Sequence, residues 1–151
     1  TKIKAAKSAT AAGCNLIIAH GKNTNSLLEL INGGKHSIFR ANLSPLNAKK
    51  KWILSKRDKL KFVKIDNGAE KALNIGKSLL AAGIKSNSNS FYRGEIVDIL
   101  SNNDTFLGCG IIAYDSDEIE MIKGKKSTEI KKALGYKGRD EVIHRNDMVI
   151  N

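Results

Sequence analysis

The stretch Gly76–Val97, GKSLLAAGIKSNSNSFYRGEIV, decides how we interpret the fold. It begins with an apolar segment, Leu79–Ile84, and continues through a polar run, Lys85–Ser90. Apolar residues resume at Phe91, and Gly94–Ile99 then alternates apolar and polar residues, which is typical of a strand. The stretch therefore predicts two strands joined by a solvated loop, in a small and mainly β domain.

The sequence around this stretch extends the β domain. Short apolar runs predict further strands at 62–65, 96–100, 105–114, 141–145 and 148–150. Helix-capping residues predict short helices that begin near Asn67, Asp115 and Ser127. The turn-forming run Ser101–Asp104 predicts a hairpin. Cys109 lies between Gly108 and Gly110, and these glycines indicate a bulge or a close backbone approach in the second strand of the hairpin. We also expect the last two strands to pair with each other across Asn146-Asp147.

Residues 1–41 have a different pattern, of alternating helices and strands. They predict a helix at 2–12 ended by Gly13, a strand at 15–19, a helix at 26–32 after Thr24 or Asn25, and a strand at 37–40. The run NLIIA at 15–19 is continuously apolar, which favours a buried, parallel strand. This α/β unit is too short to build a covered parallel sheet by itself, so we expect the chain to be a piece of a longer protein.

Residues 42–60 connect the two patterns. Ser44 precedes Pro45, the only proline, and this pair predicts the start of a short helix before the apolar patch at Trp52. We place the domain boundary near residue 59, which gives domains of residues 1–59 and 60–151. Residues 1–59 contain 12 Lys or Arg and two Asp or Glu, whereas residues 60–151 contain 14 and 13. The basic surplus would attract polyanions, and a solvated basic face is the alternative.

The cysteines and the histidines give no metal-site spacing. Cys14 and Cys109 are the only cysteines, and we expect two buried free thiols in a reducing compartment, with a disulfide as the alternative. The sequence has no run of about 18 apolar residues and no secretory signal pattern, so we predict a cytoplasmic protein without a membrane span. No catalytic set and no metal site emerge from the residues alone.

Two groups of residues are candidates for anion binding. Lys2 stands at the start of a predicted helix, where the helix N-terminus would assist it, although a lysine there is more often simply solvated. Lys77, Lys85 and Arg93 lie near the ends of the predicted central strands, close to Tyr92. Basic residues beside an aromatic ring are typical of RNA-binding surfaces, although such residues are also common on any surface.

Many short motifs, in fixed order along the chain, resemble the glutamate 5-kinase (gamma-glutamyl kinase) family. TKIKAAKSATAAG (1–13) and NLIIAHG (15–21) resemble the end of its kinase domain, where a Gly-Gly-Met-x-Thr-Lys segment leads into a helix, and KKKWI (49–53) is similar to its Lys-Arg-Trp-Ile. The motifs that resemble its C-terminal PUA domain are IDNGAEKAL (65–73), GKSLLAAGI (76–84), FYRGEIV (91–97), YDSDEIEMIKG (114–124) and LGYKGRDEVIHRNDMVI (134–150).

The resemblance implies a fold and an activity. The fold would be an α/β segment from the end of an amino-acid kinase domain, followed by a mainly β PUA domain, a pseudo-barrel with short helices. The intact protein would use ATP and Mg²⁺ to phosphorylate the side-chain carboxylate of L-glutamate in proline biosynthesis. Thr1 and Lys2 would fall in the ATP-binding segment, with Lys2 on the phosphates. A homo-oligomer is also expected from the family.

The chain also departs from the family pattern. It lacks the glycines expected before Thr1, the N-terminal lysine, the aspartates and the glutamate-binding loop, so no complete catalytic site is present and we expect this polypeptide alone to be inactive. His36 replaces a glycine of the family. Two further hypotheses stay open: that the PUA domain acts by itself in RNA binding, regulation or assembly through Lys77, Lys85 and Arg93, and that residues 1–59 mainly form an interface.

Overall fold

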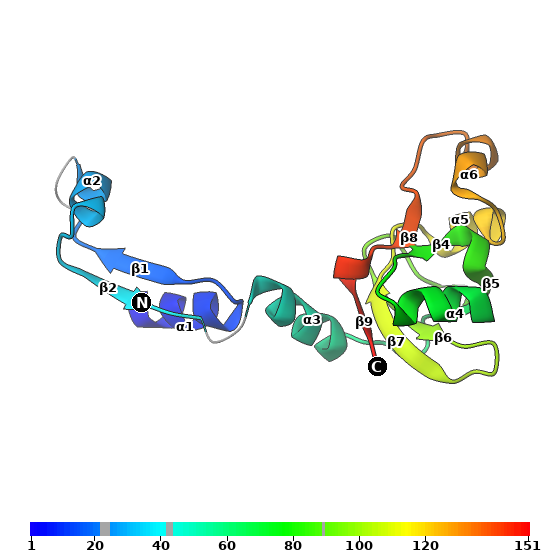
Figure 1. Ribbon diagram of the computed structural model, residues 1–151, viewed down its shortest axis with the longest axis horizontal. Coiled ribbons are helices and arrows are strands. Elements are labelled where there is room, and N and C mark those ends of the chain that lie inside the picture. Colours follow the sequence, from blue (N-terminus) through cyan, green and yellow to red (C-terminus); the bar gives the residue numbers. More distant parts are fainter. Residues whose placement is uncertain (22–24, 42–43, 89) are drawn as a thin grey trace. The chain divides into compact units, whose positions relative to one another are not determined.

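A computed structural model of the chain describes residues 1–21, 25–41, 44–88 and 90–151. These residues form two compact units, Thr1–Lys49 and Lys50–Asn151 (Figure 1). Each unit is described by itself below. Within the described residues, no helix combines the length and the apolar character needed to cross a membrane.

The first unit contains two helices and a two-stranded sheet, followed by the start of a third helix. Its elements are α1 (Lys2–Ala11), β1 (Leu16–Ala19), α2 (Ser26–Ile31), β2 (His36–Phe39) and the first turn of α3 (Pro45–Ser55). β1 and β2 are antiparallel, with Leu16 opposite Phe39 and Ala19 opposite His36. Alternate residues of β1 are exposed. The prediction of a buried, parallel strand at 15–19 is therefore wrong, because this strand pairs with its sequence neighbour and only one of its faces is covered.

Local sequence explains where these helices begin and end. Gly13 ends α1 with φ +79°, and a Cβ atom there would lie 2.7 Å from the Cα atom of Pro45. The Ser44 hydroxyl accepts a hydrogen bond from the backbone N–H of Asn47 at 3.2 Å, so Ser44 caps α3 as predicted, with Pro45 as its first residue. The alternative helix start at Thr24 lies outside the described residues, and α2 begins directly after Asn25.

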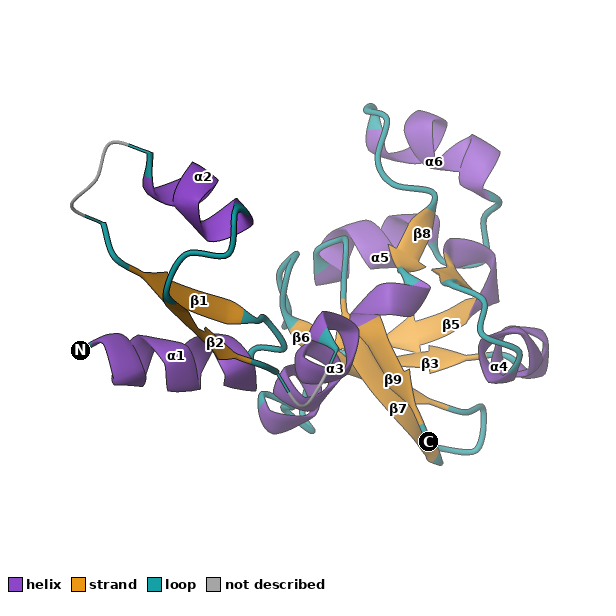
Figure 2. Cartoon of the chain, turned by 60° about the vertical axis from the view of Figure 1, so that its left-hand side comes forward, coloured by secondary structure: helices purple, strands orange, loops and turns teal. Residues whose placement is uncertain are grey.

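The second unit contains the remainder of α3, two sheets and three further helices. Its other elements are β3 (Phe62–Ile65), α4 (Asn67–Asn74), β4 (Leu79–Leu80), η1 (Ala81–Gly83), β5 (Ile84–Asn87), β6 (Ile96–Leu100), β7 (Phe106–Ile111), α5 (Ser116–Ile122), α6 (Ser127–Leu134), β8 (Glu141–Ile143), η2 (Arg145–Asp147) and β9 (Met148–Ile150). The larger sheet has the order β5-β3-β6-β7-β9, in which only β3 and β6 are parallel (Figure 2). β4 and β8 form a separate antiparallel pair.

Two predictions for this unit are confirmed. The β6–β7 hairpin turns at Asp104, whose φ of +60° is the only positive value at a described residue other than glycine. Gly108 and Gly110 mark a close backbone approach, because a Cβ atom at Gly108 would lie 2.1 Å from the backbone oxygen of Val149 in β9. These glycines allow β9 to complete the sheet.

Three predictions about strands and caps are wrong. The polar run Lys85–Ser90 is not a loop over its first three residues, because Lys85–Asn87 continues β5 and pairs with β3 at the sheet edge. The two final strands do not pair with each other, since β8 joins β4 and β9 joins β7. Lys126, rather than Ser127, is the N-cap of α6, and its backbone N–H donates to Glu129 at 2.8 Å.

The core of the second unit lies between the large sheet and the helices. Its largest fully buried side chains include Tyr114, Phe91 and Ile99. A smaller cluster joins Ile53 of α3 with Ile96 and Cys109. The compact unit therefore begins at Lys50, about ten residues before the boundary placed near residue 59, because Ile53 already packs on the sheet.

Arg57 also attaches the segment after α3 to the sheet. Its Nε and Nη2 atoms donate to the two carboxylate oxygens of Asp98 at 2.6 and 2.7 Å, and its guanidinium lies 3.7 Å from the centre of the Phe106 ring. The hydrogen bond to Asp98 raises the pKa of Arg57 further. Asp98 is only 3% exposed, so this bidentate pair supplies the charge compensation that a buried carboxylate requires.

The two cysteines are in different surroundings, which corrects the prediction that both thiols are buried. Cys109 is fully buried, and this burial raises the pKa of its thiol. Cys14 follows the turn at Gly13 and is exposed. Both are free thiols.

Candidate functional site

Lys2 lines an open pocket of about 520 Å³ in the first unit. The other lining residues come from the end of β1 and the start of β2: Ile18, Ala19, His20, Gly21, Lys35, His36 and Ser37. Two lysines and two histidines line this pocket and no acidic residue does, and Glu29 is the only acidic residue among positions 1–49. The pocket therefore favours an anion.

The start of α1 adds to this preference. Helix N-termini present backbone N–H groups without helical partners and a partial positive charge. Thr1, the N-cap residue, makes no side-chain capping bond, and Lys2 is the first helical residue. The Nδ1 atom of His36 lies 2.6 Å from the backbone oxygen of Gly34, so Nδ1 carries the proton and donates it there.

The three residues predicted to contact RNA lie in three different surroundings. Lys77 lines a groove of about 430 Å³ between α4, β4 and β8, together with Asp66, Gly83 and Glu141. The Lys85 ammonium donates to the Asn102 side chain at 2.9 Å. Arg93 lines a separate cleft. Lys77 and Arg93 line different cavities and Lys85 lines neither of these two, so the described residues do not gather the three into one site.

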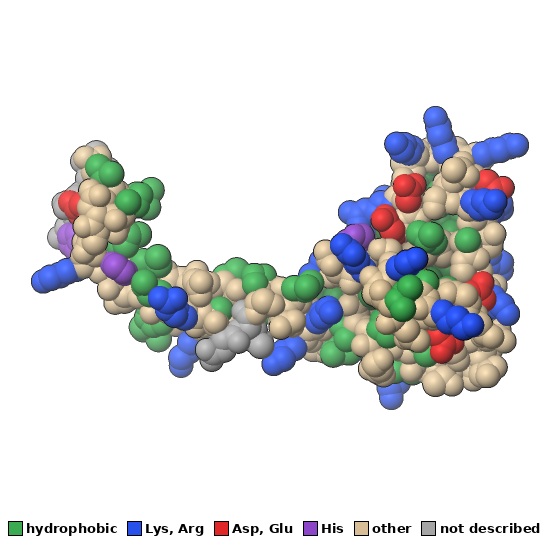
Figure 3. Space-filling model, in the orientation of Figure 1, with side chains coloured by type: hydrophobic (Ala, Val, Ile, Leu, Met, Phe, Trp, Pro, Cys, Tyr) green, Lys and Arg blue, Asp and Glu red, His purple; other side chains and the backbone are tan. Residues whose placement is uncertain are grey.

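The cleft at Arg93 has three Lys or Arg residues and one acidic residue in its lining, and we name it the Arg93 cleft. It has a volume of about 630 Å³ and lies between the β7 end and the loop after α6. Its lining consists of Arg93, Gly94, Ile111, Ile112, Ala113, Tyr136, Lys137, Gly138, Arg139, His144 and Asp147. Elsewhere on the face drawn in Figure 3, basic and acidic side chains of this unit are interspersed.

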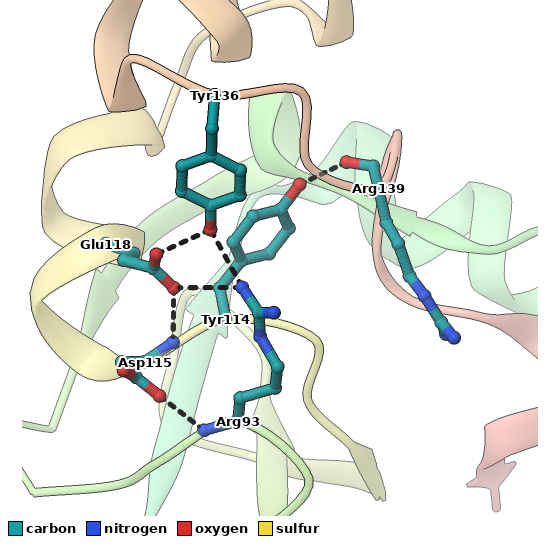
Figure 4. Close-up of polar contacts among 6 residues, drawn as sticks. All are labelled: Arg93, Tyr114, Asp115, Glu118, Tyr136 and Arg139. Atoms are coloured by element: carbon teal, nitrogen blue, oxygen red, sulfur yellow. Dashed lines mark hydrogen bonds and ion pairs between the residues drawn. The ribbon is translucent and has the colours of Figure 1, made fainter.

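Arg93 and Tyr136 form one wall of the cleft (Figure 4). The Arg93 Nη2 atom donates to the Tyr136 hydroxyl at 2.8 Å, and that hydroxyl donates to Glu118 Oε1 at 2.5 Å. Partial burial, followed by the contact with Glu118, raises the pKa of Tyr136, so the hydroxyl stays protonated at neutral pH. Glu118 itself is fixed at the start of α5, where Oε2 accepts from the Asp115 N–H at 3.0 Å.

Tyr114 holds the backbone of the loop after α6. Its buried ring supports Gly138, where a Cβ atom would lie 2.3 Å from the Tyr114 hydroxyl oxygen. That hydroxyl donates to the backbone oxygen of Arg139, while the Arg139 guanidinium points away from the cluster in Figure 4. Burial is the main cause that raises the pKa of Tyr114. The loop backbone is therefore held in place and its basic side chains remain accessible.

The sequence analysis found Arg93 but missed the residues that complete the cleft. Tyr136, Lys137, Gly138 and Arg139 form the run YKGR, which joins an aromatic residue to two basic ones directly after the helix-ending Gly135. This local composition could have identified the segment as an anion-binding loop. Its proximity to Arg93, 43 positions earlier, depends on tertiary pairing and could not be deduced from spacing.

The described residues contain no cluster of three or more His, Cys, Asp or Glu side chains that could hold a metal ion. The capping role predicted for the acidic run after Tyr114 is consistent with the structure, because Glu118 and Asp115 bond to each other at the start of α5.

Comparison with known proteins identifies both parts of the sequence. The PUA domain family matches residues 61–134. The glutamate 5-kinase of Rhizobium johnstonii is 43% identical over 150 residues, and that of Bartonella henselae is also 43% identical over 150 residues. These matches cover 99% of this chain but only 39% and 40% of the relatives, so the chain spans about two fifths of their length.

Solved structures include a PUA domain from Aeropyrum pernix K1 in a tartrate complex, which is 26% identical, covers 57% of this chain and 41% of its own, and has a TM-score of 0.43. The expected PUA domain is confirmed by the family match. The chain is similar over its whole length to the C-terminal part of glutamate 5-kinases, and its residues 61–134 match the PUA domain family.

Proposed function

We propose that this chain forms the C-terminal part of a glutamate 5-kinase, which transfers the γ-phosphoryl group of ATP to the side-chain carboxylate of L-glutamate. The observation that carries the proposal is 43% identity over 150 residues, which spans both units. The exposed apolar side chains of the first unit, among them Leu27 and Ile31, agree with a segment that packs against further kinase structure. The reaction would take place in the cytoplasm, in a homo-oligomer.

In this proposal, Thr1 and Lys2 contact the phosphates of ATP. The Lys2 ammonium lines a basic pocket and would neutralise charge that develops on the transferred phosphoryl group, while the α1 N-terminus adds its partial positive charge. The residues present do not fit Mg²⁺, because Glu29 is the only carboxylate of the first unit and it does not line this pocket. Ligands for Mg²⁺ would have to come from ATP and from residues outside this chain.

The test joins this chain to the N-terminal three fifths of the Rhizobium johnstonii relative and measures phosphorylation of glutamate that depends on ATP. We expect an active hybrid, and we expect Lys2→Ala to lower its kcat about 100-fold, the typical cost of removing one charge-stabilising donor. Lys4→Ala is the matched control, because Lys4 is exposed on the same helix and does not line the pocket. Full activity of the Lys2→Ala hybrid would contradict the assignment of Lys2.

The second candidate function is RNA binding by the PUA domain, a role with which PUA domains are associated. The PUA family match and the exposure of Lys77, Lys85 and Arg93 favour it, because exposed cationic side chains can contact phosphates. Lys77, Lys85 and Arg93 remain the proposed RNA contacts. Their separate locations imply a long RNA path rather than a single pocket.

A titration with structured RNA at two salt concentrations tests this second function. Each phosphate contact that is lost should lower the salt dependence of binding by roughly one unit in the log–log slope. We therefore expect Lys77→Gln and Lys85→Gln to weaken binding and to reduce that slope, unlike Lys71→Gln on the exposed side of α4. An unchanged slope in both variants would contradict these contacts.

A further inference from the structure

Two cationic residues of the loop after α6, Lys137 and Arg139, line the Arg93 cleft. Among the described residues, the side chains of Lys137 and Arg139 form no hydrogen bond or ion pair, although both line the cleft. Asp147 is the only acidic residue in the lining, so the cleft keeps a positive balance. Two uncompensated cations at one cavity are available for an anionic ligand.

His144 adds a donor of defined orientation. Its Nδ1 atom accepts a hydrogen bond from the backbone N–H of Asn146 at 3.2 Å. A neutral imidazole whose Nδ1 accepts must carry its proton on Nε2, so His144 presents an N–H donor at its other nitrogen. His144 is part of the cleft lining, which makes this donor a third partner for an anion.

Tyr136 supplies an aromatic wall that is already fixed. Its hydroxyl is held between Glu118 and Arg93, and 37% of the residue is exposed. Arg93 also lies 3.7 Å from Glu118, and its contacts with Glu118 and Tyr136 help to position the ring. A ring held in this way can stack on a flat ligand without a large loss of side-chain entropy.

We propose that the Arg93 cleft binds a nucleotide unit, with its phosphate on Lys137, Arg139 and the Nε2–H of His144 and its base against the Tyr136 ring. A volume of about 630 Å³ is within the range of small-ligand sites. A phosphate group matches the two cations and the N–H donor, and a base matches the fixed aromatic ring. The nucleotide comes either from an RNA strand or from the free pool. The inference does not depend on the proposed kinase activity. Where the nucleotide comes from an RNA strand, it rests on the proposed RNA binding of the PUA domain, and the cleft variants leave Lys77 and Lys85 in place, so the two proposals can fail separately.

The experiment measures binding of two probes, AMP and a single-stranded uridine hexamer, to the full chain by titration calorimetry. The double variant Lys137→Gln/Arg139→Gln should weaken binding of the recognised probe at least about tenfold. The double variant Lys71→Gln/Lys131→Gln removes the same charge from exposed helix positions that do not line the cleft, and it should change binding less than about twofold.

Substitutions of Tyr136 test the proposed stacking of the base separately. Tyr136→Leu should weaken binding about fivefold or more, because it removes the stacking surface, whereas Tyr136→Phe keeps the ring and should have a smaller effect. In the wild-type chain, nuclear magnetic resonance shifts on addition of the probe should concentrate at Gly138 and His144, which locates the site without any substitution.

The outcomes separate the sources of the nucleotide. Binding of AMP that is lost in the cleft variant identifies a free nucleotide, and binding of the hexamer alone identifies an RNA strand. The proposal is overturned if neither probe binds saturably, if the control variant loses as much affinity as the cleft variant, or if the resonance shifts lie away from the cleft.

Discussion

The two units of this chain bury their apolar residues to very different extents. In the described residues of the first unit, the only buried apolar side chains are Ala6 and Ala48, while Leu27 and Ile31 are 76% and 79% exposed. The second unit buries a continuous cluster around Phe91, Ile99 and Tyr114. The same kinds of residue thus have different energetic roles, and only the second unit has a core of its own.

Corresponding changes of isoleucine to alanine should show this difference most clearly. Ile99 is fully buried in β6 and Ile17 is 47% exposed in β1. We expect Ile99→Ala to lower the free energy of unfolding of the second unit by about 2–5 kcal/mol, because it leaves a cavity. Ile17→Ala should cost the first unit less than about 1 kcal/mol. Hydrogen exchange followed by mass spectrometry measures the stability of each unit separately. Equal losses of stability in the two variants would contradict the difference in burial between the units.

Substitution of one arginine in each unit gives a second comparison. Arg57→Ala would leave the Asp98 carboxylate buried without its bidentate partner, and we expect a loss of about 3 kcal/mol, the low end for a broken buried pair, because Arg57 is partly exposed. Arg40→Ala, at an exposed residue after β2, should change stability by less than about 0.5 kcal/mol. Urea denaturation of both variants checks this, and a small loss for Arg57→Ala would mean that water replaces the guanidinium.

The close packing of the second unit also appears at its glycines. Gly108→Ala should cost about 1–3 kcal/mol, since the new methyl group would meet the backbone oxygen of Val149 at 2.1 Å. Gly21→Ala in the first unit has open space within 4 Å, and we expect an effect within about 0.5 kcal/mol. Thermal denaturation compares the two, and a tolerated Gly108→Ala would show that β9 can shift away from β7.

The pH dependence of the free energy of unfolding should show the smallest effect. Lys61 donates to Glu95 at 2.8 Å, and this hydrogen bond, followed by that from the Tyr92 N–H, lowers the pKa of Glu95. A lowered folded-state pKa stabilises the fold above the usual carboxyl pKa, and this contribution is lost as the pH falls through the folded value. The stability difference between the wild type and Glu95→Gln should therefore shrink as the pH falls from about 5 to about 3. A difference that does not depend on pH would contradict the assignment.

Local sequence patterns were sufficient for the elements that depend on near neighbours. The turn residues at Ser101–Asp104 predicted the β6–β7 hairpin, and Ser44-Pro45 predicted the start of α3. β5 was missed because it is an edge strand, where one side pairs with β3 and polar side chains such as Lys85 remain in solvent. An alternation rule that looks for apolar residues does not detect such a strand.

Sequence patterns did not predict which strands pair when they lie far apart in the chain. The final strands were expected to pair across Asn146-Asp147, yet β8 pairs with β4 about 60 positions earlier and β9 pairs with β7. The candidate site depends on the same kind of contact, because the hydrogen bond between Arg93 and Tyr136 joins residues 43 positions apart. Basic and aromatic composition identified Arg93 as a candidate, but it could not identify which residues line the cleft beside it.

Arg57 and Ile53 have a consequence for dividing this protein into autonomous pieces. The PUA family match begins at residue 61, downstream of both residues. A fragment cut there would remove the guanidinium that satisfies Asp98 and the side chain that covers Cys109. The minimal fragment that can refold by itself should therefore begin at Lys50, and limited proteolysis of the native chain should spare the segment from Lys50 to Lys61.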